Sequence, residues 1–394
     1  MPFTLYGDGV HDDTAAIQEL INTSGTELRL PVPKVCYLIS APLELPSDFK
    51  LVLPRFAEIK LAKGSNCVML KNKTVTDRQE RTKYKLWDHI NEWSPDYPCE
   101  NIEVEGGIWN LNNLEQNQNP LLTGVYEPKG YNGFIFLFYN VKNLRISSLT
   151  LKDPVTFAVT LDTVTYFTVD NIIFDFNYGN PLATNMDGIH IDGNSHYGNI
   201  TNLKGACYDD LVALNSHEGS DGPISNITIS GIYSEDCHSA VRLLAAGTRV
   251  SNIHISDIYG TYFQYCVGLT KYYPQDTPLG YYGAITIDNV YASKAPWIPE
   301  YNKGEGTYAY PLIWIEENLR VDSLKVQNLH REEYTLPIET FYVGENTVIG
   351  RMLLDNISVD NHTGKEKMPF MDNRGEIKYL RAQNLFEDGE AFEL

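Results

Sequence analysis

A strand-like repeat dominates this sequence from about residue 140 onward. Segments such as ISNITISGIYS, VSNIHISDIYG and YGAITIDNVYA place Asn or Gly before residues that alternate between apolar and polar types. Four isoleucines at equivalent places, Ile200, Ile227, Ile253 and Ile285, are separated by 27, 26 and 32 residues. Alternation with a period of two indicates β-strands, and strand repeats of this length without intervening helices indicate stacked coils.

A solenoid of parallel coils is the fold that the repeats predict. A propeller blade needs ~40–50 residues, which is longer than the repeat, so we expect an all-β, right-handed parallel β-helix. The chain has 394 residues, whereas one globular core stops growing at roughly 250–300. A solenoid escapes this limit because each coil packs only on its neighbours. No linker is evident, so residues 1–394 are expected to form a single domain.

Two stretches depart from the strand pattern. The segment DGVHDDTAAIQELINTSG has Asp12 or Asp13 as a candidate N-cap and Gly25 beyond the last apolar position. It predicts a helix over about residues 12–25 that caps the open end of the solenoid core. Residues 72–133 are charged, aromatic and rich in Asn. We expect them to form loop excursions that wall one side of a groove.

The cysteines and the charge balance exclude several classes of function. Cys207, Cys237 and Cys266 follow one another at 30 and 29 residues, which predicts a stacked interior ladder, with a disulfide as the alternative. No CxxC spacing occurs, so neither a zinc site nor any other metal or cofactor is expected. The net charge of −20 argues against nucleic acid as a partner. No run of ~18 apolar residues is present to span a membrane.

A series of polar residues recurs at about the period of one coil. Asp187 lies in NMDGIHIDG, and Asp209 and Asp210 open the strand-like segment DDLVAL 22 residues later. His238, in EDCHSAVRLL, follows 29 residues after Asp209. If these segments are equivalent strands in neighbouring coils, their side chains project from one outer face. The series therefore predicts a catalytic group made of Asp187, Asp209, Asp210 and His238.

Further residues are expected to contact a substrate at the same face. Lys271 follows His238 by 33 residues, and Arg242 lies four residues beyond His238 on the same segment. Cations at these places suit the carboxylate or hydroxyl groups of a sugar. The remaining candidates lie beside the acids and the lysine, and they are His190, Tyr208 and Tyr272.

Hydrolysis of a glycosidic bond is the chemistry that this set fits. One carboxylic acid must protonate the leaving oxygen, while a second carboxylate activates water or attacks the sugar. Crowded acids raise one another's pKa, which can keep one of them protonated near neutral pH. The expected partner is therefore a polysaccharide or oligosaccharide. The oligomeric state is left open.

The motifs resemble a known enzyme family. The opening GDGVHDDTAAIQ is similar to the start of pectate-lyase-like β-helix enzymes and phage tailspikes. The series NMDG, YDDLVAL, CHSAVRLL and GLTK resembles glycoside hydrolase family 28, the polygalacturonase and rhamnogalacturonase group. The resemblance implies that Asp209 is the general acid, that Asp187 and Asp210 position the attacking water, and that the anomeric configuration inverts. It also matches His238 and Lys271 to the family's His and Lys.

The chain departs from the family pattern at several places. Cys237 and Ser239 flank His238 where the family has two glycines, and Leu269 occupies the place of the family's Arg. Arg242 is expected to supply the missing cation from the neighbouring coil. These departures concern the identity of the sugar more than the class of reaction.

Two alternatives remain open at this point. A polysaccharide lyase or epimerase on the same scaffold would use a base such as Lys271 or Tyr272. A non-catalytic, tailspike-like protein would bind carbohydrate without cleaving it. The N-terminus MPFTLYGDG lacks the basic start and apolar stretch of a secretion signal. A polysaccharide substrate predicts a secreted protein, extracellular or periplasmic, and the cytoplasm is the alternative location.

Overall fold

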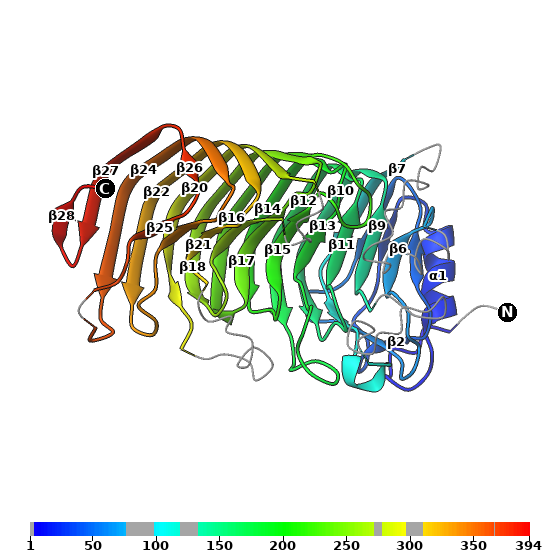
Figure 1. Cartoon of the computed structure of the whole chain (residues 1–394). Coiled ribbons are helices and arrows are strands. Elements are labelled where there is room, and N and C mark those ends of the chain that lie inside the picture. The colour runs from blue at the N-terminus through cyan, green and yellow to red at the C-terminus, as the bar shows by residue number, and fades with distance from the viewer. Residues whose placement is uncertain (1–3, 76–97, 119–132, 272–277, 297–309, 366) are drawn as a thin grey trace. The chain divides into compact units, whose positions relative to one another are not determined.

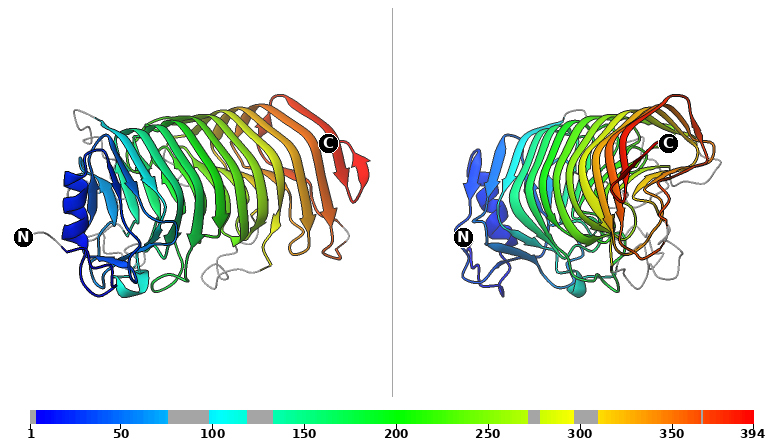
Figure 2. Two further views of the ribbon diagram at one scale, coloured as in Figure 1. Left: turned by 180° about the vertical axis from the view of Figure 1, so that it is seen from behind. Right: turned by 90° about the vertical axis from the view of Figure 1, so that its left-hand side faces the viewer.

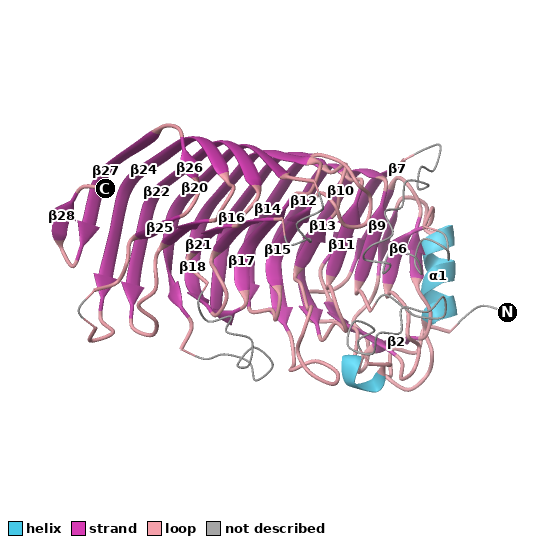
Figure 3. Ribbon diagram, in the orientation of Figure 1, coloured by secondary structure: helices cyan, strands magenta, loops and turns pink. Residues whose placement is uncertain are grey.

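Strands make up most of the chain, as Figure 3 shows in magenta. The structure is a computed structural model that describes residues 4–75, 98–118, 133–271, 278–296, 310–365 and 367–394. The strands are stacked in parallel coils, so the predicted parallel β-helix is confirmed. Two compact units are present: Met1–Asn199 with Glu218–Ser220, and Ile200–His217 with Asp221–Leu394. Each unit is described below by itself.

The first unit begins with the expected helix, α1 (Thr14–Thr23). Asp13 is its N-cap residue, but the Asp13 side chain does not cap the helix. The first helical N–H, that of Thr14, instead donates to Oδ1 of Asp12 at 2.8 Å. The buried face of α1 carries Ala16, Ile17 and Ile21, and the helix packs on β3 (Leu43–Leu45) and β1 (Glu27–Arg29). Figure 1 shows α1 in blue beside the first coils, which it covers as predicted.

Two parallel sheets build the coils of the first unit. The column Leu51, Val104, Ile146 and Val169 runs through four neighbouring strands of one sheet, and each of these side chains is fully buried. The first sheet consists of β1 (Glu27–Arg29), β2 (Tyr37–Ile39), β4 (Phe49–Val52), β5 (Glu58–Leu61), β7 (Cys99–Glu105), β8 (Ile108–Asn110), β10 (Val141–Lys152) and β12 (Thr165–Asp175). The second consists of β3 (Leu43–Leu45), β6 (Leu70–Asn72), β9 (Phe136–Tyr139), β11 (Val159–Asp162) and β13 (Ile189–Ile191).

The predicted excursion over residues 72–133 needs correction. Cys99–Glu105 and Ile108–Asn110 are strands that pair with β10, because their alternating apolar residues fill the core like those of any other coil. A one-turn 3₁₀ helix, η1 (Asn113–Glu115), follows them. The rest of the predicted excursion lies largely outside the described residues.

The second unit continues the same construction. Ile227, Ile253 and Ile285 are paired across neighbouring strands, which confirms the register that the repeat predicted. Its long-stranded sheet contains β16 (Ile224–Cys237), β18 (Arg249–Tyr262), β20 (Gly280–Lys294), β22 (Leu319–Glu333), β24 (Val348–Asn361), β26 (Glu376–Ile377), β27 (Leu380–Glu387) and β28 (Glu390–Phe392). Its short-stranded sheet contains β15 (Asp210–Asn215), β17 (Ser239–Leu244), β19 (Val267–Thr270), β21 (Ile313–Ile315), β23 (Phe341–Val343) and β25 (Met371–Asn373). Strand β14 (His196–Gly205) contains the boundary between the units.

The recurring Asn residues explain how the long strands bend. Asn226, Asn252 and Asn356 have φ angles of 59°, 56° and 55°, a left-handed conformation that Asn tolerates better than most residues. Equivalent Asn side chains also bond to one another between coils, as Asn252 does to Asn226 at 3.1 Å. Figure 2 shows the bent strands of the second unit side by side.

The predicted cysteine ladder is confirmed for Cys207 and Cys237 in the second unit, whereas Cys266 is level with Ala240 rather than with Cys237. Cys207, Cys237 and Cys266 are fully buried, and the sulfur atoms of Cys207 and Cys237 are 3.6 Å apart. All six cysteines of the chain lie in the described residues, and none forms a disulfide. Among the described residues, no helix is long and apolar enough to cross a membrane.

Candidate active site

The carboxylate of Asp210, in the second unit's short-stranded sheet, accepts hydrogen bonds from three neighbouring side chains. Asp210 opens β15 and is fully buried. Ser239 and Tyr265 both donate a hydroxyl hydrogen bond to its Oδ1, the Tyr265 bond at 3.2 Å. Arg242 donates from Nη1 to Oδ2, also at 3.2 Å. Three donors from two neighbouring coils therefore fix the orientation of both oxygens.

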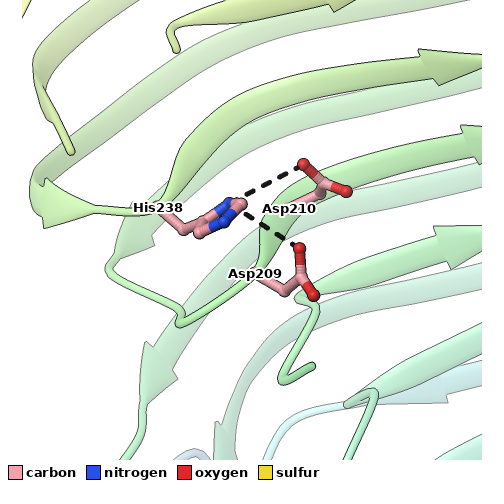
Figure 4. A group of neighbouring side chains, drawn as sticks. All are labelled: Asp209, Asp210 and His238. Carbon is pink, nitrogen blue, oxygen red and sulfur yellow. Dashed lines mark ion pairs between the residues drawn. The ribbon is translucent and has the colours of Figure 1, made fainter. Parts of the chain in front are cut away.

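His238 lies directly beside the two acids, as Figure 4 shows. Its neighbour Ser239 is in register with Asp210, so the predicted match between the acid pair and His238 is confirmed. The Nδ1 atom of His238 is 3.6 Å from Oδ1 of Asp209 and 4.0 Å from Oδ1 of Asp210. These are ion-pair distances rather than hydrogen bonds.

Burial controls the charge of His238. It lowers the pKa of the imidazole to about 4; Asp210 opposes this shift, while the cations Arg242 and Lys294 add to it. The ring is packed edge-on against Phe263, with centroids 5.2 Å apart. His238 is therefore a neutral imidazole at physiological pH.

Asp209 is the acid of this group that solvent reaches. Its side chain is 22% exposed, compared with 1% for Asp210. Asp209 precedes the strand, whereas Asp210 belongs to it, and successive side chains of an extended chain point to opposite sides. The pair therefore combines one accessible carboxyl group with one that is held rigidly by its neighbours.

The structure places one predicted substrate-binding residue, Arg242, beside the acids. Arg242 is bonded to Asp210, however, and its side chain is only 14% exposed. Tyr208 is half-buried beside Asp209 in the sequence. Tyr272 lies outside the described residues. Contact of any of these three with a substrate stays a prediction.

The expected register of Lys271 is wrong. Val241 pairs with Val267, a spacing of 26 residues, so the residue level with His238 in the next coil is Gln264. Lys271 follows the last residue of β19, at the other end of the strand, and is buried. Its backbone N–H donates to the Glu316 carboxylate. The spacing of 33 residues misled the prediction because it includes most of the length of β19.

One group among the described residues has the spacing of metal ligands. The ligand atoms of Asp209, Asp210 and His238 lie within 4.8 Å of one another. Both oxygens of Asp210, however, already accept hydrogen bonds from Ser239, Tyr265 and Arg242, and a cation there would be repelled by the Arg242 guanidinium. The residues present thus fit an acid pair better than a metal centre, and the expected absence of a metal stays a prediction.

Asp187 belongs to a second buried cluster, in the first unit. Its Oδ2 is 2.6 Å from Nδ1 of His190, which lies in β13. Nε2 of His190 is 3.2 Å from Asp192 and 3.4 Å from Glu218, and Phe157 stacks on the imidazole with centroids 3.9 Å apart. His190 is therefore enclosed by three carboxylates and one aromatic ring. The predicted position of Asp187 beside Asp209 stays a prediction.

His190 carries a positive charge in this environment. Burial alone would lower the pKa of its imidazole, but Asp192 and Asp187 outweigh burial and raise the pKa to about 10. The turn at Gly219 fits closely over Asp162 and Asp192, because a Cβ atom at Gly219 would lie 2.6 Å from Asp162 Oδ2 and 2.6 Å from Asp192 Cγ. His190 thus lies within the protein rather than lining a groove: its side chain is 2% exposed.

A family comparison covers both clusters. Residues 100–261, less than half of the chain, match the family described as Glycosyl hydrolases family 28. This segment includes Asp187, Asp209, Asp210, His238 and Arg242, and it ends before Lys271. Over these residues the chain is similar to glycoside hydrolase family 28. No curated protein sequence matches it.

Solved structures with the same fold come from proteins of several kinds. The family 28 exopolygalacturonase of Yersinia enterocolitica is 13% identical with a TM-score of 0.52, covering 95% of this chain and 76% of that one. The surface adhesin PfbA of Streptococcus pneumoniae is 16% identical with a TM-score of 0.53, covering 98% and 90%. An N-terminal fragment of bacteriophage phi29 gene product 12 is 16% identical with a TM-score of 0.60, covering 97% and 69%. At these identities, the likeness shows the fold of the family 28-like protein alone.

Sequence reasoning missed several residues of both clusters. Ser239 and Tyr265 orient Asp210, and Glu218 completes the surroundings of His190. Lys294, buried at the end of β20, donates to the carbonyls of Phe263 and Tyr310, and burial lowers its pKa to about 7. Ser239, next to His238, carried a signal in the sequence as a departure from the family pattern.

Proposed function

We propose that this family 28-like protein is a glycoside hydrolase that cleaves a bond within a polysaccharide or oligosaccharide. One observation carries the proposal: the solvent-accessible acid Asp209 adjoins the rigidly bonded Asp210 and the neutral imidazole of His238. An accessible proton donor and a fixed carboxylate are the two functions that glycosidic hydrolysis requires. The match to family 28 over residues 100–261 supports the same reaction class.

Asp209 is the general acid of the proposed reaction. Its proton passes to the glycosidic oxygen as the bond between that oxygen and the anomeric carbon breaks. A carboxylate removes a proton from water, whose oxygen forms the new bond to the anomeric carbon. We assign this base to Asp210; a role for Asp187 is implied by the family resemblance alone. Attack by water from the opposite face inverts the anomeric configuration.

His238 and Arg242 support the acids rather than exchanging protons with the substrate. A neutral imidazole beside Asp209 adds no positive charge that would drive the proton off the acid before the substrate binds. Arg242 holds Oδ2 of Asp210, which fixes the base at one angle. Both residues are therefore positioning residues in this proposal.

Substitution of the acid tests the proposal. Purified protein is first screened against a panel of polysaccharides with reducing-end detection, and Asp209→Asn is then assayed on each polymer that is cleaved. We expect kcat to fall by ~100-fold or more, the usual contribution of a general acid, with an unchanged circular dichroism spectrum. Asp360→Asn, on β24 of the same unit, is the matched control and should retain wild-type turnover. Wild-type turnover of Asp209→Asn would contradict the assignment.

The same screen separates the alternatives. A lyase would release an unsaturated sugar, which absorbs in the ultraviolet and has no counterpart in hydrolysis. An epimerase would change the sugar composition without releasing reducing ends. A binding protein would retain polysaccharide and release no product from any polymer of the panel.

A further inference from the structure

A row of outward-facing side chains crosses the short-stranded sheet of the second unit. Alternate residues of a strand face the same side, and the interior side here is marked by the buried column Leu243, Leu269, Ile315 and Val343. The opposite, outer side carries the intervening residues. In register from one coil to the next, this outer row consists of Arg242, Gly268, Trp314, Tyr342 and Asp372.

A cavity of about 570 Å³ lies at Tyr342 in this row. Its size falls within the ~300–1,000 Å³ range that is usual for sites of small ligands. The other lining residues are polar, and most of them follow the ends of β21 and β23. They are Glu317, Asn318, Glu345, Asn346 and Arg374.

Contacts within the cavity wall hold its aromatic side chain in place. The Arg374 guanidinium carbon lies 5.4 Å from the centroid of the Tyr342 ring, and Nε and Nη2 of Arg374 donate to Asp372 at 3.0 and 2.9 Å. Asn346 donates to Asn318 across the neighbouring coils at 3.2 Å. Tyr342 is half-buried between two buried neighbours in β23. A fixed aromatic ring surrounded by amides and carboxylates is a surface that suits a sugar ring, which has apolar faces and a polar edge.

The charge of the cavity restricts the kind of sugar. Its wall carries two carboxylates, Glu317 and Glu345, against one cation, Arg374, which is already paired with Asp372. A sugar with its own carboxylate would meet an excess of like charge and no uncommitted cation among these lining residues. A neutral sugar would meet hydrogen-bond acceptors and amides instead.

We propose that this cavity is an accessory subsite for a neutral sugar residue of the polymer that the protein acts on. The inference rests on the proposed function for the identity of the polymer. Tyr342 lies three strands beyond Arg242 along the outer row, which is about 14 Å at the ~4.8 Å spacing of neighbouring strands. A chain bound at Asp209 and laid along this row would thus extend to Tyr342, with Trp314 on the way.

Affinity electrophoresis measures this binding without turnover. Gels are cast with soluble galactan, arabinan or xylan as neutral polymers, or with polygalacturonate as the uronate polymer, and Asp209→Asn serves as the inactive background. We expect retardation by at least one neutral polymer and little by polygalacturonate. Adding Tyr342→Ala should weaken that retardation about fivefold or more, because a fixed aromatic anchor is lost. Adding Tyr281→Ala, an exposed tyrosine of the long-stranded sheet, should leave retardation unchanged.

Charge reversal gives the second arm of the test. Glu345→Lys, at an exposed position of the cavity wall, should create retardation by polygalacturonate. The inference is overturned if no neutral polymer retards the protein, if polygalacturonate retards the wild type as strongly, or if Tyr342→Ala migrates as its parent does. Because none of these readouts depends on cleavage, they are separate from the turnover assay that tests the proposed function.

Discussion

His190 and His238 are both largely enclosed histidines beside carboxylates, yet the protein gives them different charge states. In the first unit, Nδ1 of His190 lies 2.6 Å from Asp187, and the pKa of His190 is raised to about 10. In the second unit, Nδ1 of His238 lies 3.6 Å from Asp209, and the pKa of His238 is lowered to about 4. A carboxylate nearby is therefore insufficient to charge a buried imidazole.

The difference lies in the balance of charge around each imidazole. Asp187, Asp192 and Glu218 surround His190, and the two aspartates raise its pKa. Asp210, by contrast, already pairs with Arg242, whose positive charge also disfavours protonation of His238. The first histidine is thus a structural cation, and the second is a neutral neighbour of an acid.

Removing each imidazole in turn should change the free energy of unfolding by clearly different amounts. His190→Gln removes an imidazolium that lies among three carboxylates, and loss of one partner of a buried ion pair typically costs ~3–5 kcal/mol. His238→Gln removes no charge, so the loss should be about 1 kcal/mol, as for one modest polar contact. Thermal and urea unfolding of the two variants measure the difference. Equal destabilisation by both substitutions would contradict the assignment of charge.

Arg242→Ala tests whether the cation of the second unit acts by holding Asp210. Because Arg242 holds Asp210, kcat should fall about 10-fold to 100-fold, equivalent to ~1.4–2.7 kcal/mol, with a smaller change in KM. Tyr265→Phe removes a different donor to the same carboxylate and should cost only several-fold, as expected of one hydrogen bond. Steady-state kinetics on a cleaved polymer measure kcat and KM for both variants. A raised KM with unchanged kcat would instead make Arg242 a substrate contact.

The pH dependence of stability tests the charge of His190 in the wild-type protein. A histidine whose pKa is about 10 in the folded protein and ~6.5 when unfolded stabilises the fold fully below pH 6.5. This contribution is lost as the pH rises toward 10. We therefore expect the unfolding temperature of the wild type to fall over this window more than that of His190→Gln. Parallel pH profiles for the two proteins would contradict the shift.

The sequence predicted the features that depend on the repeat itself. Ile227, Ile253 and Ile285 face the core, and a shift by one residue would expose the whole set, so the register of these strands was readable. The pairing of Asp210 with the residue after His238 follows from the same regularity. The capping helix was visible because its apolar residues change from a period of two to helical spacing.

The features that failed depend on the lengths of turns and on side-chain direction. The sequence predicts Lys271 beside His238 because it does not reveal the lengths of the turns on either side of β18, which lies between β17 and β19 in the chain. The structure puts Gln264 there instead. The donors Ser239 and Tyr265 and the third acid at His190, Glu218, come from positions whose side chains could have pointed elsewhere. The charges of the two histidines were also unreadable, because they depend on burial and on contacts such as those of Glu218 with His190 and of Arg242 with Asp210.

Histidine-edited NMR across a pH titration tests the central claim most directly. With His190→Gln and His238→Gln to assign the signals, the imidazole of His190 should remain protonated up to about pH 9, and that of His238 should remain neutral down to about pH 5, each about one unit short of its midpoint. Midpoints for both residues near the ordinary value of ~6.5, or midpoints in the reverse order, would contradict the account.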